Sequence, residues 1–166
     1  MSEPPLTTSD PETELLEAAV EAPAEAPRVG ILTGSTADLL VLEEAGAILT
    51  EHHVAWELRV ASAHEEPDTV AAYCRNARMR GLRVLIAGGT LSAGLPSIAA
   101  AHTDLPVIGV PLSGLGSVSG GLDAVLGTVQ APPGAPVAAV GLDNARNAAL
   151  LAIRILASGD PSAPVR

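Results

Sequence analysis

Aromatic side chains are almost absent from this chain of 166 residues, which has one Trp, one Tyr and no Phe. Single-stranded nucleic acids are commonly held by bases that stack on aromatic rings, so this mode of binding is nearly excluded. The formal net charge of −10 points the same way, because a nucleic-acid backbone or an anionic membrane would repel the protein. We therefore expect small molecules or proteins as partners, and neither nucleic acid nor membrane.

Cysteine is equally scarce, with Cys74 as its one representative. A single cysteine cannot form a disulfide within the chain, and no positively charged segment followed by an apolar one marks a signal peptide. No apolar run approaches the ~20 residues that a bilayer span needs. These absences favour a cytoplasmic protein. No Cys and His residues have zinc spacing and no phosphate-binding lysine motif occurs, so we predict no metal and no other cofactor.

The chain divides into an acidic tail and one domain. Residues 1–27 are rich in Glu, Pro and Ala, which is typical of a solvated, disordered segment, although a short helix over 11–22 could instead dock on a neighbour. Between residues 28 and 158, short apolar runs alternate with helical patterns. This region is the predicted domain, and residues 159–166 form a short C-terminal tail.

Five apolar runs predict strands, and amphipathic patterns follow each of them. Runs this short and continuously apolar are typical of strands that are buried on both faces, as in a parallel sheet between two helical layers. We therefore predict an α/β fold, a three-layer αβα doubly wound parallel five-stranded sheet of the flavodoxin-like or Rossmann-like kind. The predicted strands are 28–34, 55–61, 82–89, 106–112 and 136–142. The predicted helices are 37–52, 66–80 with Gly81 just past its end, 93–101, 121–129 and 144–157.

The loop "GSTAD" follows the first predicted strand, at the edge of the sheet where ligands bind in such folds. Gly34 lets a ligand approach the backbone, and the Ser35 hydroxyl could hold an anion together with helix N-terminal amides. Asp38 could accept hydrogen bonds from ribose hydroxyls. The alternative is an ordinary capped turn, with Ser or Thr before the helix and Asp in its first turn.

His64 lies in the loop "SAHEE" after the second predicted strand, on the same edge. An imidazole there can donate or accept a proton near neutral pH, and Ser62 can orient it or a substrate carboxylate. The alternative is a surface histidine without a chemical role. His52, His53 and His102 fall at predicted helix ends, where an imidazolium complements the helix dipole, and we interpret them as structural.

Five segments resemble the PurE family of purine biosynthesis, which comprises aminoimidazole ribonucleotide carboxylases and carboxyaminoimidazole ribonucleotide mutases. They span about residues 28–157 and read "GSTAD", "SAHEEP", "VLIAGGTLSAGLPSIAAAHTDLPVIGVP", "GGLDAVLGTVQAPPGAPVAAV" and "NARNAALLAIRILA". The resemblance implies a nucleotide-binding enzyme that moves a carboxyl group on or off a heterocycle by proton transfer. It also implies carbon dioxide as substrate or product, and a homo-oligomer, with the octamer common in the family as the expected state.

The resemblance assigns roles residue by residue. The histidine of the family's "SAHRTP" is the proton-transfer residue and corresponds to His64, with Ser62 beside it as a second catalytic residue. The family's "GSxSD" loop binds the substrate phosphate and ribose. Together with the glycine-rich third loop, this gives an expected set of substrate-binding residues: Gly34, Ser35, Asp38, Glu65, Gly88, Gly89, Thr90, Ser92, Gly94 and Pro96.

Three positions depart from the family pattern. Glu65 replaces the arginine that pairs with phosphate, Ala37 replaces a serine, and Gly94 stands in place of a second active-site histidine. Glu65 turns a charge-assisted attraction of about 1.5–3 kcal/mol into a repulsion, unless it only caps the next helix. We therefore expect a carboxylase, decarboxylase or mutase acting on a non-standard substrate in a specialised biosynthetic pathway. The alternatives are the ordinary carboxyaminoimidazole ribonucleotide mutase of purine biosynthesis and a non-catalytic nucleotide-binding paralogue.

Overall fold

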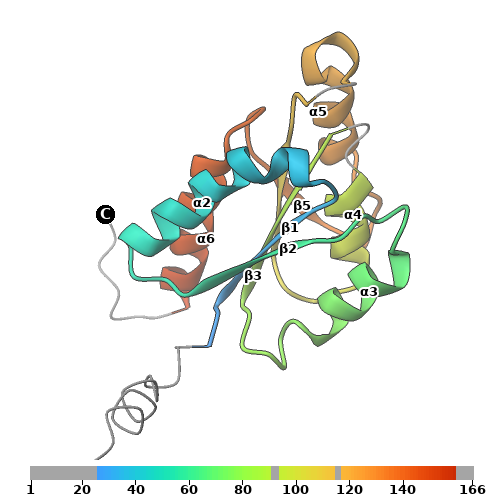
Figure 1. Cartoon of the computed structure of the whole chain (residues 1–166). Coiled ribbons are helices and arrows are strands. Elements are labelled where there is room, and N and C mark those ends of the chain that lie inside the picture. Colours follow the sequence, from blue (N-terminus) through green and yellow to red (C-terminus); the bar gives the residue numbers. More distant parts are fainter. Residues whose placement is uncertain (1–25, 91–93, 115–116, 160–166) are drawn as a thin grey trace, which may run out of the picture.

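The computed structural model describes residues 26–90, 94–114 and 117–159. The predicted helix over 11–22, the predicted substrate residue Ser92 and most of both predicted tails lie outside these ranges. Figure 1 shows a twisted sheet with helices on both of its faces. The strands are β1 (Val29–Thr33), β2 (Trp56–Val60), β3 (Val84–Gly89), β4 (Val107–Pro111) and β5 (Val137–Ala139). The helices are α2 (Leu39–Glu51), α3 (Pro67–Asn76), α4 (Gly94–Ala101), α5 (Leu122–Val129) and α6 (Ala145–Ser158), with short 3-10 helices at Thr36–Asp38 and Val118–Gly121.

All strands of the sheet run parallel, in the spatial order β2-β1-β3-β4-β5. Helices α2 and α6 pack together over one face, while α3 and α4 cover the other with α5 beside them (Figure 1). This order is that of a flavodoxin-like doubly wound sheet. The predicted α/β class and the three-layer αβα architecture are therefore confirmed.

The core is aliphatic, as the scarcity of aromatic residues requires. Strands β1, β3 and β4 are buried along their whole length. The prediction that every strand is buried on both faces was wrong for β2 and β5, which are half-buried or exposed. Both are edge strands, so part of each lacks a covering helix or a second neighbouring strand.

Several predicted boundaries shift. Helix α3 ends at Asn76 and not just before Gly81 as predicted, because the chain turns after Asn76. The N–H of Leu82 donates to the carbonyl of Ala77 at 3.1 Å, and Gly81 has a positive φ of 100° that glycine readily adopts. The turn delivers the chain directly to β3. Among the described residues, no helix is both long and apolar enough to cross a bilayer.

Each of the two aromatic rings of the chain lies against a glycine. A Cβ at Gly46 in α2 would overlap the indole of Trp56, and a Cβ at Gly30 in β1 would overlap the hydroxyl of Tyr73. The Trp56 indole N–H donates to Thr50 Oγ1 at 2.9 Å, which fixes the ring beneath α2. These glycines are needed for space, since neither has a positive φ.

Candidate functional site

The first two loops meet at the carboxyl edge of the sheet, which is the edge where the parallel strands end. The N–H of Ala61 donates to the carbonyl of Thr33 at 2.8 Å, so the chain still pairs just beyond β1 and β2. A Cβ at Gly34 would lie 3.7 Å from Cα of Ser62, which shows how closely the two loops approach. The structure thus brings the predicted "GSTAD" and "SAHEE" loops side by side.

Ser35 caps the short 3-10 helix that follows β1. Its Oγ accepts a hydrogen bond from the N–H of Ala37 at 3.1 Å, and its own N–H donates to Thr33 Oγ1 at 3.3 Å. The capped-turn interpretation of this loop is therefore confirmed. The hydroxyl proton of Ser35 finds no acceptor among the described residues, so the same group can also donate to a bound anion.

Asp38 is only 6% exposed and lies where the 3-10 helix passes into α2. Burial raises the pKa of its carboxyl above the ordinary value, a hydrogen bond from Thr33 lowers it, and the negative charge of Asp143 raises it further. The Thr33 hydroxyl donates to Asp38 Oδ2 at 3.2 Å. Asp38 is thus a carboxyl group that is held in one orientation and is poorly solvated.

Asp143 lies in the loop after β5 and holds the loop after β4 through hydrogen bonds. Its carboxylate accepts two hydrogen bonds from Ser113, one from the backbone N–H at 2.8 Å and a short one from the hydroxyl. Its N–H donates to the carbonyl of Pro111 at 2.9 Å. Asp143 has a φ of 53°, a left-handed conformation that is uncommon outside glycine and that concentrates at functional sites.

A hollow of about 280 Å³ opens between these loops. Its wall carries three carboxylates, from Asp38, Glu44 and Asp143, and no arginine or histidine among the described residues. The backbone of Gly114 forms part of this wall and approaches Thr90 and Asp38 closely. A Cβ at Gly114 would lie only 2.6 Å from Thr90 Cγ2 and 3.5 Å from Asp38 Oδ1. The hollow therefore suits hydroxyl or amino groups that donate hydrogen bonds to carboxylates.

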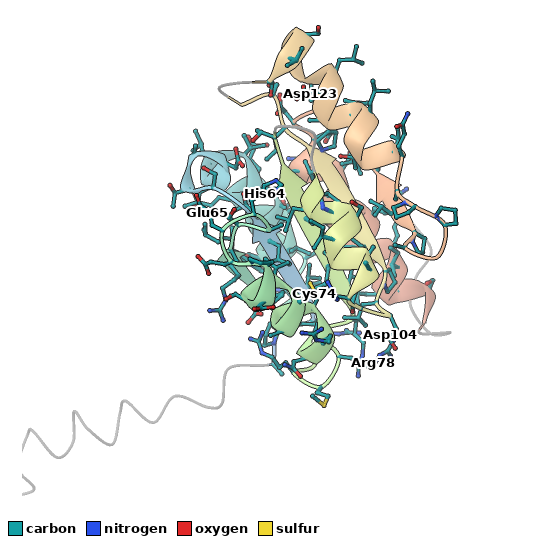
Figure 2. The ribbon with its side chains drawn as sticks, turned by 90° about the vertical axis from the view of Figure 1, so that its right-hand side faces the viewer. His64, Glu65, Cys74, Arg78, Asp104 and Asp123 are labelled. Carbon is teal, nitrogen blue, oxygen red and sulfur yellow. The ribbon has the colours of Figure 1, made fainter. Side chains whose placement is uncertain are left out.

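His64 and Glu65 lie in the exposed turn between β2 and α3, toward the carboxyl edge in Figure 2. The N–H groups of both residues donate to Ser62 Oγ at 3.3 Å, so Ser62 holds the backbone of this turn and does not contact the imidazole. The described residues give the Glu65 carboxylate no hydrogen bond, and Glu66 precedes α3 without a side-chain cap. Neither residue lines the hollow.

The third-loop residues divide into packed and accessible positions. Gly88 and Gly89 are buried within β3, where a Cβ at Gly88 would meet the side chains of Leu42 and Leu112. Pro96 is buried in α4. Thr90 is half-buried, and Gly94, which begins α4, has only Ile98 Cδ1 near its Cβ position, at 3.7 Å. Among the third-loop residues that the structure describes, Thr90 and Gly94 are therefore the ones that can face a ligand.

Asp143, Ser113 and Glu44 were not singled out from the sequence. The loops of Asp143 and Ser113 follow predicted strands, which was the available signal, but nothing in their local sequence shows that one residue holds the other. Glu44 reads as an ordinary exposed residue of α2. Across the described residues, no group of three or more His, Cys, Asp and Glu is arranged to hold a metal ion.

Comparison with known proteins agrees with the fold. Over 130 residues the chain is 49% identical to the N5-carboxyaminoimidazole ribonucleotide mutase of Pyrococcus abyssi, which covers 78% of the chain and 74% of the relative. It is 49% identical to the phosphoribosylaminoimidazole carboxylase of Schizosaccharomyces pombe over 86% of the chain, but spans only 26% of that longer protein.

A solved structure of Treponema denticola PurE superposes with a TM-score of 0.70 at 26% identity, covering 81% of the chain and 82% of that structure. The family described as AIR carboxylase matches residues 28–165, which is more than half of the sequence. These agreements confirm the resemblance inferred from the motifs. The chain belongs to the AIR carboxylase family.

Proposed function

We propose that the protein catalyses the carboxyaminoimidazole ribonucleotide mutase reaction of purine biosynthesis. The observation that carries this proposal is His64 on the carboxyl edge, in a turn whose backbone is held by Ser62 beside the "GSTAD" loop. The identity of 49% to a relative named for this reaction supports it. We therefore prefer the ordinary reaction to the non-standard substrate that Glu65 and Ala37 suggest on their own.

The chemistry requires one group that can both give and take a proton. When the bond between the exocyclic nitrogen and the carboxyl group breaks, carbon dioxide leaves and the nitrogen gains a proton. When a ring carbon then attacks carbon dioxide, that carbon loses its proton. His64 can serve both steps, because an imidazole can give a proton in one step and take one back in the next. No net proton is consumed.

The neighbouring groups suit a ribonucleotide. Asp38 is buried, oriented by Thr33 and able to accept hydrogen bonds from ribose hydroxyls. The free hydroxyl proton of Ser35 and the backbone amides near it can hold the phosphate. Thr90 and Gly94 lie where the heterocycle would approach β3. In this arrangement the ribose lies between the hollow and the first loop.

The active site is completed by a second subunit, and we propose the homo-octamer as the assembly. The hollow of about 280 Å³ is smaller than the ~300–1,000 Å³ typical of sites for drug-sized ligands. It also lacks cationic side chains among the described residues, although a phosphate dianion favours them. A neighbouring subunit can supply both the missing wall and positive charge. A cytoplasmic location remains our prediction.

A second candidate is the same carboxyl transfer on a substrate without phosphate. Two observations favour it: the exposed carboxylate of Glu65 beside His64, and the acidic wall of the hollow. Such a substrate would present hydroxyl or amino groups where the ribonucleotide presents its phosphate. Binding to Glu65 and Asp38 would then replace binding to an arginine.

The test is conversion of N5-carboxyaminoimidazole ribonucleotide by the purified protein, followed by chromatography of substrate and product. We expect turnover, and we expect His64→Asn to lower kcat by at least ~10²-fold, the usual contribution of a general acid or base. His102→Asn is the matched control, since His102 follows α4 at the other edge of the sheet.

The outcomes separate the candidates. Turnover of the phosphorylated substrate that depends on His64 supports the mutase. Turnover of the dephosphorylated substrate alone supports the second candidate. Binding of the ribonucleotide without conversion of either substrate would leave a non-catalytic nucleotide-binding paralogue, and it would refute both enzymatic proposals.

A further inference from the structure

Arginines gather at the amino edge of the sheet, where the strands begin, far from the site described above. The chain has no lysine, and four of its nine arginines fall within residues 75–83. A fifth, Arg28, directly precedes β1, and its carbonyl accepts the N–H of Arg83 at 2.8 Å. Figure 2 shows Arg78 and Asp104 at the end of the molecule opposite His64. We call these five residues, Arg28, Arg75, Arg78, Arg80 and Arg83, the arginine edge.

A groove of about 510 Å³ lies at one side of the arginine edge and is lined by two of its members, Arg75 and Arg78. Arg75, Arg78 and Met79 line one side of it, and His102 and Asp104 line the other. The Met79 side chain is 80% exposed, although methionine is usually buried. The groove therefore offers positive charge next to an uncovered apolar side chain.

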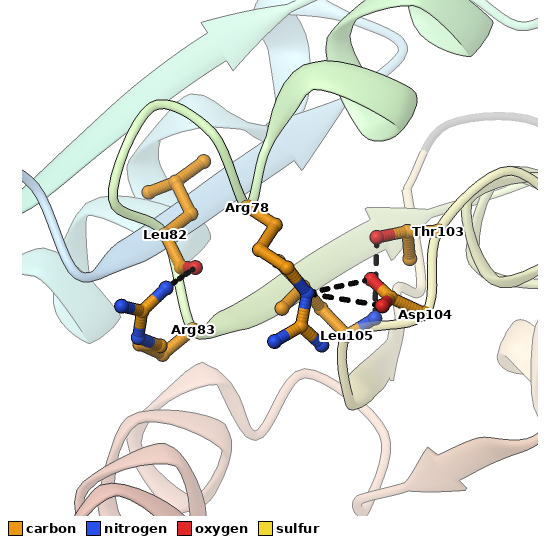
Figure 3. A network of polar contacts seen from close by, with 6 residues as sticks. All are labelled: Arg78, Leu82, Arg83, Thr103, Asp104 and Leu105. Atoms are coloured by element: carbon orange, nitrogen blue, oxygen red, sulfur yellow. Dashed lines mark hydrogen bonds and ion pairs between the residues drawn. The ribbon is translucent and has the colours of Figure 1, made fainter.

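The arginines outnumber their carboxylate partners. Arg78 Nε lies 3.0 Å from Asp104 in a pair whose side chains are 53% and 71% exposed, and Figure 3 shows this pair with Arg83, which donates to the carbonyl of Leu82. Arg80 pairs with Glu57. Within the described part of the chain, Arg28, Arg75 and Arg83 have no carboxylate partner. Positive charge is left over at this edge, in a protein of net charge −10.

The N-terminal tail joins the domain at the same place. A Cβ at Gly81 would lie 3.4 Å from Cβ of Ala26 and 3.7 Å from the carbonyl oxygen of Pro27. Gly81 itself lies between Arg80 and Arg83 in the sequence. Residues 1–25, which end beside this turn, contain seven carboxylates and no arginine.

We propose that residues 1–25 dock on the arginine edge of their own chain, with their carboxylates against the unpaired arginines. Single exposed ion pairs contribute little, but a tethered segment meets its site at an effective concentration of the order of millimolar. Intrinsic affinity in the millimolar range, which several weak pairs supply together, is then enough. The apolar stretch "LLEAAV" of the tail can cover Met79. This docking does not depend on the proposed reaction.

The tail is a better occupant than the alternatives. A second copy of the chain that docked through the same edge would bring its own unpaired arginines to the contact, where like charges repel. A separate anionic partner would compete with a segment of opposite charge that starts a few ångströms away. Docking also shields the arginines from polyanions.

Energy transfer from Trp56 tests the proposal on the full chain. Trp56 is the only tryptophan and begins β2, in register with Val29 next to Arg28. A fluorophore is attached to Ala18→Cys within the tail. Cys74 stays unlabelled, because it is buried and burial raises the pKa of its thiol to about 11.

We expect the transfer to fall when salt is raised to 1 M, where the Debye length is ~3 Å, and to keep a residual level because the tail stays tethered near Trp56. Arg75→Gln with Arg83→Gln should lower the transfer at low salt to that residual level. The matched control, Arg146→Gln with Arg154→Gln, changes two exposed arginines of α6 and should leave the transfer unchanged.

Neutralising the tail tests the same contact without touching the domain. Glu14→Gln, Glu17→Gln and Glu21→Gln should reduce the transfer as the arginine variant does. Equal transfer in the arginine variant and its control would overturn the proposal. So would a fall in molecular mass of the arginine variant with unchanged transfer, because the arginine edge would then be a contact between subunits.

Discussion

Removing the carboxylate of Asp143 should loosen the loop that carries Ser113, and two substitutions separate the causes. Asp143→Ala deletes both hydrogen bonds to Ser113 and keeps a non-glycine residue at a φ of 53°. Asp143→Gly deletes the same bonds but removes the conformational strain. The difference between the two variants therefore measures the strain at this position.

The magnitudes follow from the contacts. Each hydrogen bond contributes about 1 kcal/mol to the free energy of unfolding, because both partners are partly exposed. Asp143→Ala should then lose about 2 kcal/mol. A left-handed conformation costs a residue with a Cβ roughly 1–2 kcal/mol, so Asp143→Gly should lose only about 1 kcal/mol or less. Ser113→Ala, which removes the hydroxyl alone, should lose about 1 kcal/mol.

Urea denaturation at one protein concentration measures these differences through the midpoint, provided that the slope m is unchanged. The mutase assay measures the second effect, a rise in KM as the wall of the hollow becomes mobile. If Asp143→Gly were no more stable than Asp143→Ala, the left-handed backbone would not be strained. A loss below ~0.5 kcal/mol in the alanine variant would show that the two hydrogen bonds contribute little.

Four further results are expected. Burial raises the pKa of the Asp38 carboxyl in the folded protein above the ordinary value of ~3.9. The protonated carboxyl therefore stabilises the folded state fully below pH ~3.9, and this contribution is lost as the pH rises through the pKa of the folded state. Asp38→Asn should therefore gain stability relative to wild type with rising pH, while losing activity, and a pH-independent difference in urea midpoint would contradict this. Glu65→Arg with Ala37→Ser should lower KM for the phosphorylated substrate, and an unchanged KM would show that neither side chain faces the phosphate. Gly46→Ala should lower the free energy of unfolding by about 1–3 kcal/mol through overlap with Trp56, and better helix propensity should offset ~1 kcal/mol of this loss. A higher Tm of the variant would contradict the packing described here. Light scattering should give an octamer, and a monomer at micromolar concentration would remove the proposal of a site shared between subunits.

The inner part of the fold could be predicted because its pattern is local. The runs around β1, β3 and β4 are apolar without interruption, and burial on both faces demands that composition. The edge strand β2 contains Glu57 and Arg59, which signal partial exposure. The early end of α3 was not predicted, because residues 77–80 continue a helical composition and only the tertiary turn toward β3 stops the helix.

Site features that depend on one loop alone could be predicted from the sequence, whereas contacts between two loops could not. The Ser35 cap and the exposed position of His64 follow from their strand ends. The hydrogen bonds between Asp143 and Ser113 join residues that are 30 positions apart in the sequence, and no spacing rule relates them. The burial of Asp38 was missed for a similar reason, since Gly114, from the loop after β4, lies close to its carboxylate.

The two contacts between a glycine and an aromatic ring constrain the order in which substitutions can accumulate in this lineage. At Gly46 an added Cβ overlaps the indole of Trp56, and at Gly30 it overlaps the hydroxyl of Tyr73, so alanine destabilises the fold while these groups are present. Replacing the aromatic side chain first leaves space that an alanine can later fill, whereas the reverse order passes through an overpacked intermediate. Relatives that carry alanine at either glycine position are therefore expected to carry a smaller side chain at the matching aromatic position, and to have lost that bulk before they gained the methyl group.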